Sequence, residues 1–194
     1  MTHPFERWPR NRRRLALVVV ICAAVLPLML SAATTPLAEN EPGGRTIVDF
    51  ELAGSVEEAD EILATWRADR VIDDAKAIQL FDLIYPLIYA SALAGACIGA
   101  AGAWRRARAP GLAAAGIAAA WVAFAAAVFD YIENVGLAVS LWGHPASPWP
   151  ELARVAAVLK FAATLVALAY ALTWIVAASA MTIRRRFPRS PTAG

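Results

Sequence analysis

The chain has few of the residues that usually bind metal ions. Its 194 residues include only two cysteines and two histidines. Cys22 and Cys97 both lie within apolar stretches, where a thiol usually packs as a small hydrophobic side chain. His3 and His144 are too far apart in the predicted topology to share an ion. This scarcity argues against a zinc site of the multi-histidine type, and we expect no metal site.

Charged residues are also scarce, and this indicates a membrane protein. Only 18% of the residues are charged and 59% are hydrophobic, with a mean hydropathy of +0.52. Four apolar stretches (residues 15–33, 78–103, 111–141 and 152–183) approach or exceed the roughly 20 residues that a helix needs to cross a bilayer. The sequence therefore predicts an all-α membrane protein, a bundle of four transmembrane helices.

Basic residues are concentrated on one side of this predicted bundle. Arginines cluster in residues 1–14, 104–110 and 184–194. Because basic loops stay in the cytoplasm, we expect both termini to be cytoplasmic. The segment 34–77 carries eleven carboxylates against four basic residues and is expected outside the cytoplasm. The basic clusters are thus topology signals, and we expect no nucleic-acid partner.

The first apolar stretch has two interpretations. Three arginines at 12–14, an apolar run and the small residues 31–33 are also typical of a cleaved signal peptide. The run is longer than the roughly 7–15 apolar residues of such a peptide. We therefore favour a retained membrane anchor over residues 15–33.

The acidic segment contains local signals of secondary structure. Residues 47–52 alternate between apolar and polar, which predicts a short strand. Residues 55–58 have the pattern of a capping box, which predicts a helix through about Trp66. A second helix is expected to begin near Asp69 and to run without a break into the second span. Pro86 is expected to kink that span and to free backbone carbonyls.

The third and fourth apolar stretches are longer than one crossing requires. A rise of about 30 Å takes about 20 residues at 1.5 Å per residue. About ten further apolar residues continue beyond that length in each stretch. We therefore predict an extended hairpin, closed by an outer loop at residues 142–151, that packs on the acidic segment.

Four ionisable residues within the apolar stretches fall at nearly one depth. Counting about 20 residues from the cytoplasmic end of each span brings Asp82, Asp130, Glu133 and Lys160 close to the outer boundary of the hydrocarbon. A charge at this depth costs a few kcal/mol or more unless it is paired. We therefore expect these side chains to point into the bundle, with Lys160 paired to Asp130 or Asp82.

Helical spacing adds polar neighbours to each of these charges. Residues three or four positions apart share one face of a helix. This rule groups Asn134 with Asp130 and Glu133, two tyrosines with Asp82, and Thr164 with Lys160. The candidate ligand-binding residues are Asp82, Tyr85, Tyr89, Asp130, Tyr131, Glu133, Asn134, Lys160 and Thr164. We assign no catalytic residue and no cofactor.

Two motifs resemble those of a known group of proteins. Residues 82–89 have the pattern D-x-x-(F/Y)-x-x-x-Y, and residues 130–134 have the pattern D-x-x-E-N. In these motifs, and in residues 50–53 and 62–66, the chain resembles an uncharacterised family of bacterial four-helix integral membrane proteins. The resemblance implies an architecture, a polar site and a place in the bacterial cytoplasmic (inner) membrane, but no reaction.

Three functions are compatible with this pattern. The polar layer is expected to bind a lipid headgroup, a small amphiphile or a cation, with membrane lipid as a partner. Alternatively, its charges clamp the helices of a structural or accessory subunit that joins another membrane protein. A third alternative is a proton- or cation-coupled transporter, which would have to assemble as a homo-oligomer because four spans are few. The sequence alone does not decide among them, nor whether the protein is an enzyme.

Overall fold

The computed structural model describes residues 45–186, and the side chains of residues 45–173. All regular secondary structure in this part of the chain is helical, which confirms the all-α prediction there. The predicted first span at residues 15–33, and Cys22 within it, lie outside the described residues.

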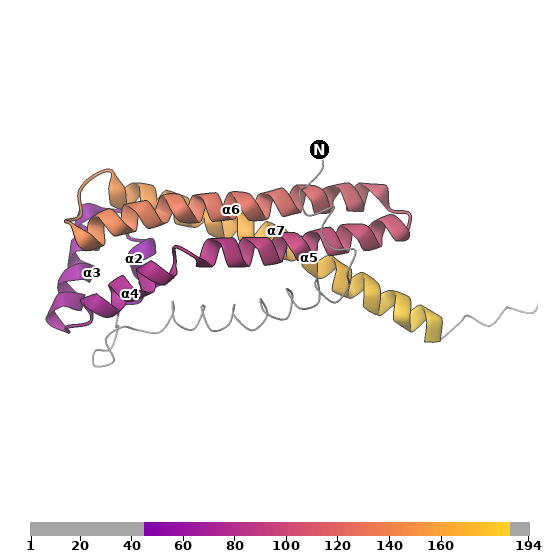
Figure 1. Cartoon of the computed structure of the whole chain (residues 1–194), viewed down its shortest axis with the longest axis horizontal. Coiled ribbons are helices and arrows are strands. Elements are labelled where there is room, and N and C mark those ends of the chain that lie inside the picture. Colours follow the sequence, from indigo (N-terminus) through magenta and orange to yellow (C-terminus); the bar gives the residue numbers. More distant parts are fainter. Residues whose placement is uncertain (1–44, 187–194) are drawn as a thin grey trace, which may run out of the picture.

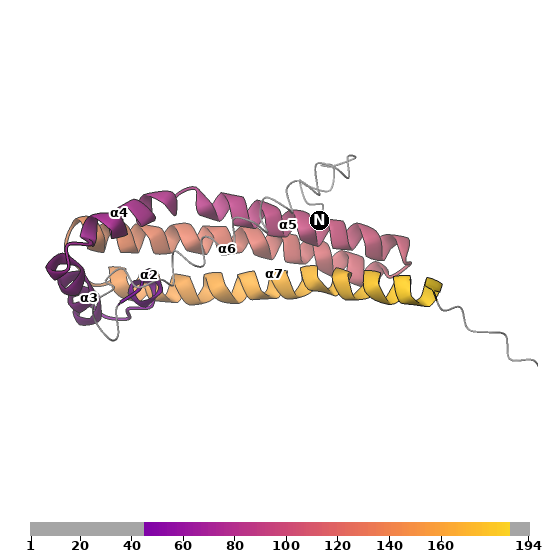
Figure 2. The same cartoon turned by 90° about the horizontal axis from the view of Figure 1, so that it is seen from below.

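Three long helices run side by side along the molecule (Figures 1 and 2). They are α5 (Tyr85–Arg106), α6 (Pro110–Trp142) and α7 (Trp149–Arg186). Each contains a stretch long and apolar enough to cross a membrane, which in α7 is Trp149–Thr173. Three such helices are consistent with a multi-pass membrane protein.

Three short helices gather at one end of the long ones (Figure 1). They are α2 (Ile47–Glu51), α3 (Val56–Ala68) and α4 (Ile72–Phe81), and we refer to residues 45–81 as the cap. The buried side chains of the cap form one hydrophobic core with Leu137, Leu141 and Ala153 of the α6–α7 hairpin. The hairpin therefore packs on the acidic segment, as the sequence predicted.

The first cap element is a helix, so the predicted strand at residues 47–52 is wrong. Thr46 caps α2 by accepting a hydrogen bond from the Asp49 amide (3.1 Å), and the Asp49 carboxylate accepts one from the Thr46 amide (2.7 Å). A helical turn brings Ile47, Phe50 and Glu51 to the same buried side. This burial outweighs the weak preference for a strand that the alternation suggested.

Helix α3 begins at the predicted capping site. The Ser55 hydroxyl accepts a hydrogen bond from the Glu58 amide (3.2 Å), and the Glu58 carboxylate accepts one from the Gly54 amide (2.7 Å). After α3 the chain turns through Arg70, whose φ of 62° lies in the left-handed region. The Val71 amide then bonds to the Trp66 carbonyl (3.0 Å), as in a Schellman motif.

Helices α4 and α5 are separated by a break, so the predicted uninterrupted helix is wrong. The break spans residues 82–84, and Pro86 lies in the first turn of α5, where proline is well tolerated. Proline has no amide hydrogen to donate to the carbonyl four residues earlier. That carbonyl, of Asp82, instead accepts a hydrogen bond from Asn134 Nδ2 (3.1 Å), and the Leu83 carbonyl accepts one from the Tyr131 hydroxyl (2.9 Å).

Small residues fill the core of the long helices below the cap. Ala94, Ala120, Ala123 and Ala167 are fully or almost fully buried there with the Cys97 thiol. Large apolar side chains such as Val128, Val158 and Leu165 instead point outward from the bundle. This distribution is typical of membrane helices, whose backbones approach closely through small residues.

Candidate functional site

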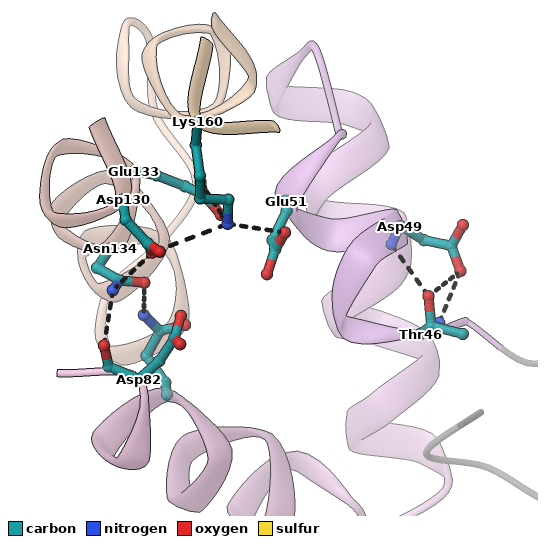
Figure 3. Close-up of polar contacts among 9 residues, drawn as sticks. Thr46, Asp49, Glu51, Asp82, Asp130, Glu133, Asn134 and Lys160 are labelled. Carbon is teal, nitrogen blue, oxygen red and sulfur yellow. Dashed lines mark hydrogen bonds and ion pairs between the residues drawn. The ribbon is translucent and has the colours of Figure 1, made fainter. Parts of the chain in front are cut away.

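A buried group of polar residues lies where the cap meets the three long helices (Figure 3). Its members come from α2, α4, the break, α6 and α7, and all are buried except the half-buried Asp82. We call it the polar cluster; it consists of Glu51, Gln79, Asp82, Asp130, Glu133, Asn134 and Lys160. The structure thus brings together the four ionisable residues that the sequence placed at one depth.

Lys160 is at the centre of the cluster's charges. Its Nζ lies 2.8 Å from both carboxylate oxygens of Glu133, 3.2 Å from Oε2 of Glu51 and 3.8 Å from Oδ1 of Asp130. The expected pair with Asp130 is therefore present but is the longest of the three. A direct ion pair with Asp82 is not among the contacts of the described residues. One ammonium thus joins α2, α6 and α7.

Asn134 connects the second half of the cluster. Its Oδ1 accepts a hydrogen bond from Gln79 Nε2 (2.7 Å) on α4. Its Nδ2 donates to the Asp82 carbonyl (3.1 Å) and, more weakly, to Asp130 Oδ1 (3.4 Å). One side-chain amide therefore holds the end of α4 and the break against α6.

The tyrosines and Thr164 lie around the cluster. Tyr131 bonds to the backbone of the break, as described above. The rings of Tyr85 and Tyr89 on α5 pack with their centroids 5.2 Å apart. The buried Tyr89 hydroxyl interacts with Asp130 and Thr164, although it makes no hydrogen bond of good geometry with either.

The cluster has more carboxylates than ammonium groups. Glu51, Asp82, Asp130 and Glu133 face a single lysine. Arg154 on the same helix as Lys160 does not correct this imbalance, because it is exposed and packs over Gly54. A buried carboxylate without a full counter-charge is costly, so the cluster favours the uptake of positive charge.

Asp82 lies before the first of the three apolar helices, and its titration reflects this imbalance. Burial raises the pKa of the Asp82 carboxyl from 3.8 to about 6, although the Lys160 ammonium lowers it and the hydrogen bond to Asn134 lowers it further. Glu51 raises it by repulsion. Desolvation therefore exceeds the attraction of the single lysine.

Sequence reasoning missed two members of the cluster, Glu51 and Gln79. Glu51 is one of the eleven carboxylates of the acidic segment, and the predicted strand would direct its side chain to the face opposite that of Phe50. The capping pattern of Thr46 and Asp49 was the signal that could have located it. Gln79 lies four residues after the buried Ala75 and three before Asp82, so helical spacing could have assigned it to the inward face.

The described residues contain no group of three or more histidine, cysteine or acidic side chains arranged to hold a metal ion.

Comparison of the chain with protein families, with characterised proteins and with solved structures gave no match. The resemblance to bacterial four-helix membrane proteins therefore stays a prediction.

Proposed function

We propose that the chain is a multi-pass protein of the bacterial inner membrane whose polar cluster binds a small monovalent cation. The ion is a proton or an alkali ion, and its occupancy controls how firmly the cap is held. The observation that supports this proposal is the ratio of four carboxylates to one ammonium in a buried cluster.

Charge balance gives the physical reason. An ionised carboxylate that is removed from water costs several kcal/mol unless a counter-charge or hydrogen bonds compensate it. Lys160 neutralises one such charge, and Asn134 offers hydrogen bonds to a second. A proton or an alkali ion compensates one of the two carboxylates that remain, and the half-buried Asp82 retains some contact with solvent.

The distribution of side chains supports a place near the outer side of the membrane. Exposed apolar residues such as Val128, Val135 and Val158 surround the level of the cluster on α6 and α7. The exposed Arg105 in the last turn of α5 and the exposed Arg108 in the turn that follows lie at the end of α5 far from the cap. Basic residues at that end and carboxylates in the cap favour a cytoplasmic turn and an outer cap.

Two polar contacts tie the cap to the long helices, and one of them depends on charge. Gln79 bonds to Asn134 whatever the ionisation state, whereas Glu51 holds Lys160 through an ion pair of 3.2 Å. Positive charge that reaches Asp130 or Glu133 frees Lys160 from those carboxylates and strengthens its hold on Glu51. Binding of a cation is thereby coupled to α2.

A lipid headgroup is a less favoured ligand than a small cation. The Lys160 ammonium already occupies the position that the amine of a headgroup would take among the carboxylates. Glu51 and its helix α2 also cover the cluster on the cap side (Figure 3). A proton or a dehydrated alkali ion needs far less space.

Hydrogen–deuterium exchange of the purified protein in detergent tests the proposal. We expect the amides of residues 47–51 to gain or lose protection, after correction for intrinsic exchange, either between about pH 5.5 and 8.5 or between choline and sodium buffers. The variant Glu51→Gln should abolish this dependence, whereas the exposed-residue control Glu57→Gln should keep it. Protection that is the same in every buffer overturns the proposal.

A structural clamp is the second candidate, and one observation favours it. Lys160 joins three elements, and breaking a buried ion pair costs about 3–5 kcal/mol. A clamp predicts constant protection of α2 in every buffer, together with a large loss of stability in Lys160→Met. The same exchange experiment therefore separates the two functions.

A further inference from the structure

One hydroxyl beside the polar cluster is buried without a hydrogen bond. Tyr89 on α5 is 9% exposed, and its hydroxyl oxygen is inaccessible and unpaired. Three other buried side-chain atoms in the described part share this state: Trp104 Nε1, Glu133 Oε2 and Glu151 Oε2. Glu133 Oε2 has the Lys160 ammonium at 2.8 Å, so within the cluster region the Tyr89 hydroxyl is the group that makes no hydrogen bond of good geometry. Such groups in native proteins mark bound water or an ion.

Two polar groups on the neighbouring helices interact with the Tyr89 hydroxyl. They are the Asp130 carboxylate on α6 and the Thr164 hydroxyl on α7. On the other side of Tyr89 the packing is apolar, with Ala90, Ala126 and Ala127 buried around the ring. The unpaired hydroxyl therefore lies at the border between the polar cluster and the alanine-packed core.

Asp130 is the ion-paired carboxylate that receives least compensation. Its distance to Lys160 Nζ is 3.8 Å, against 2.8 Å for Glu133 and 3.2 Å for Glu51. The hydrogen bond that it accepts from Asn134 is also long, at 3.4 Å. Among the three carboxylates that pair with Lys160, Asp130 therefore has the longest contact to the ammonium, and two hydroxyls lie beside it.

We propose that Tyr89, Asp130 and Thr164 bind one sodium ion. The three oxygens come from three different helices, and hard cations prefer oxygen ligands. One carboxylate with two neutral hydroxyls matches the charge of a monovalent ion and not that of a divalent one. This inference rests on the proposed function, because it names the ion and the residues that would compensate the surplus carboxylates.

Thermal unfolding of the purified full-length protein in detergent tests the site, with sodium chloride replaced stepwise by choline chloride at constant ionic strength and pH. We expect the melting temperature to rise with sodium along a saturating curve. Tyr89→Phe keeps the ring and removes the hydroxyl, and Thr164→Val keeps the shape of the side chain. Each should weaken the apparent sodium affinity by about tenfold or more.

Two control variants remove hydroxyls that the site does not use. Tyr131→Phe removes the bond to the Leu83 carbonyl, and Thr173→Val removes the bond to the Tyr170 carbonyl. Each can change the basal stability, but we expect both to retain the sodium dependence of the wild type. All four substitutions are conservative, so we expect the variants to fold. The unfolding curve of each variant in choline alone shows whether it has done so.

The outcomes separate this inference from the proposed function. Identical curves in sodium and choline overturn the sodium site, as does a sodium dependence that Tyr89→Phe leaves unchanged. If the exchange of α2 still depends on pH in either case, a proton is the cation and the proposed function stands. If neither sodium nor pH changes α2 or the melting temperature, both proposals fail.

Discussion

The cap and the long helices are built on opposite packing rules. The cap core contains large side chains, with Phe50 and Trp66 in edge-to-face contact at 5.3 Å beside the fully buried Leu63. The buried core of the long helices is mainly alanine; larger side chains such as Leu93 and Phe124 are only partly buried against it, and others such as Val128 point outward. The first arrangement is that of a domain stabilised by removing apolar surface from water. The second is that of helices held by close backbone approach in an apolar solvent.

The polar cluster lies where these two packing rules meet. On the cap side of the cluster, Glu51 and Gln79 extend from helices whose other buried side chains form the large-residue core of the cap. Below the cluster, the ring of Tyr89 packs among buried alanines. The cap core includes Leu137, Leu141 and Ala153 from the outer ends of α6 and α7, whereas the alanine core lies further along the long helices. Substitutions in one of these two cores should therefore leave the other largely intact.

The largest effect is expected from the core of the cap. Trp66→Ala removes a fully buried ring and should destabilise the cap by about 3–5 kcal/mol. Hydrogen exchange should report lost protection in α2–α4, a smaller loss at the ends of α6 and α7 that join the cap core, and little change in α5. The control Trp142→Ala removes a half-exposed ring and should have a much smaller effect. An equal loss in both regions would show that the two cores are not separate.

The converse change overfills the alanine core. Ala123 is fully buried, so Ala123→Leu should destabilise the long helices by about 1–3 kcal/mol. The matched change Val128→Leu on the outward face of the same helix should be almost neutral. Thermal unfolding in detergent measures both, and a tolerated Ala123→Leu would contradict the close packing described here.

A pH titration examines the border itself. Since the pKa of Asp82 rises from 3.8 to about 6 on folding, the folded state holds this proton more tightly than the unfolded state. The resulting stabilisation is complete below about pH 4 and is lost as the pH rises through about 6, by at most about 3 kcal/mol. Asp82→Asn should flatten the melting temperature over this range, whereas the exposed-residue control Asp74→Asn should not. A curve unchanged by Asp82→Asn would remove Asp82 from the titrating groups.

The smallest effect is expected in the turn between α3 and α4. Arg70 has a φ of 62°, a conformation that costs a residue with a side chain about 1–2 kcal/mol and glycine very little. Part of this gain is offset because glycine loses more backbone entropy on folding. The net result of Arg70→Gly should be a cap that is more stable by up to about 1 kcal/mol. Arg70→Ala removes the same charge but keeps the strained angle, and it should bring no gain in chemical denaturation.

Local patterns in the sequence were sufficient for most of the fold. The capping site at Ser55 and the long apolar runs of α6 and α7 predicted these helices, because their signals lie within a few turns of chain. Helix α2 was mistaken for a strand since one turn of helix is too short for its periodicity to be distinguished from alternation. Pro86 predicted only a kink at the start of the second span. The break itself could not be predicted because it is held by Asn134 and Tyr131, some 50 residues away.

The grouping of polar residues could be predicted in part. Equal depth and helical spacing brought Asp130, Glu133, Asn134 and Lys160 together, because charges in apolar helices must find one another. The partners from the cap could not be located in this way. Glu51 reaches Lys160 across 109 positions of sequence, and only the folded cap brings it there.

The position of Lys160 late in the chain has a consequence for biosynthesis. Glu51 precedes it by 109 residues and Glu133 by 27, so the ribosome completes the acidic partners before their one ammonium. Until α7 emerges, α6 enters the membrane with carboxylates that no lysine of that helix neutralises, and its insertion is only provisional. Nascent chains that end before Lys160 should therefore be extracted from membranes by alkali more readily than chains that include all of α7. Synthesis of the last helix thus supplies the ammonium that pairs with the carboxylates of the helix before it.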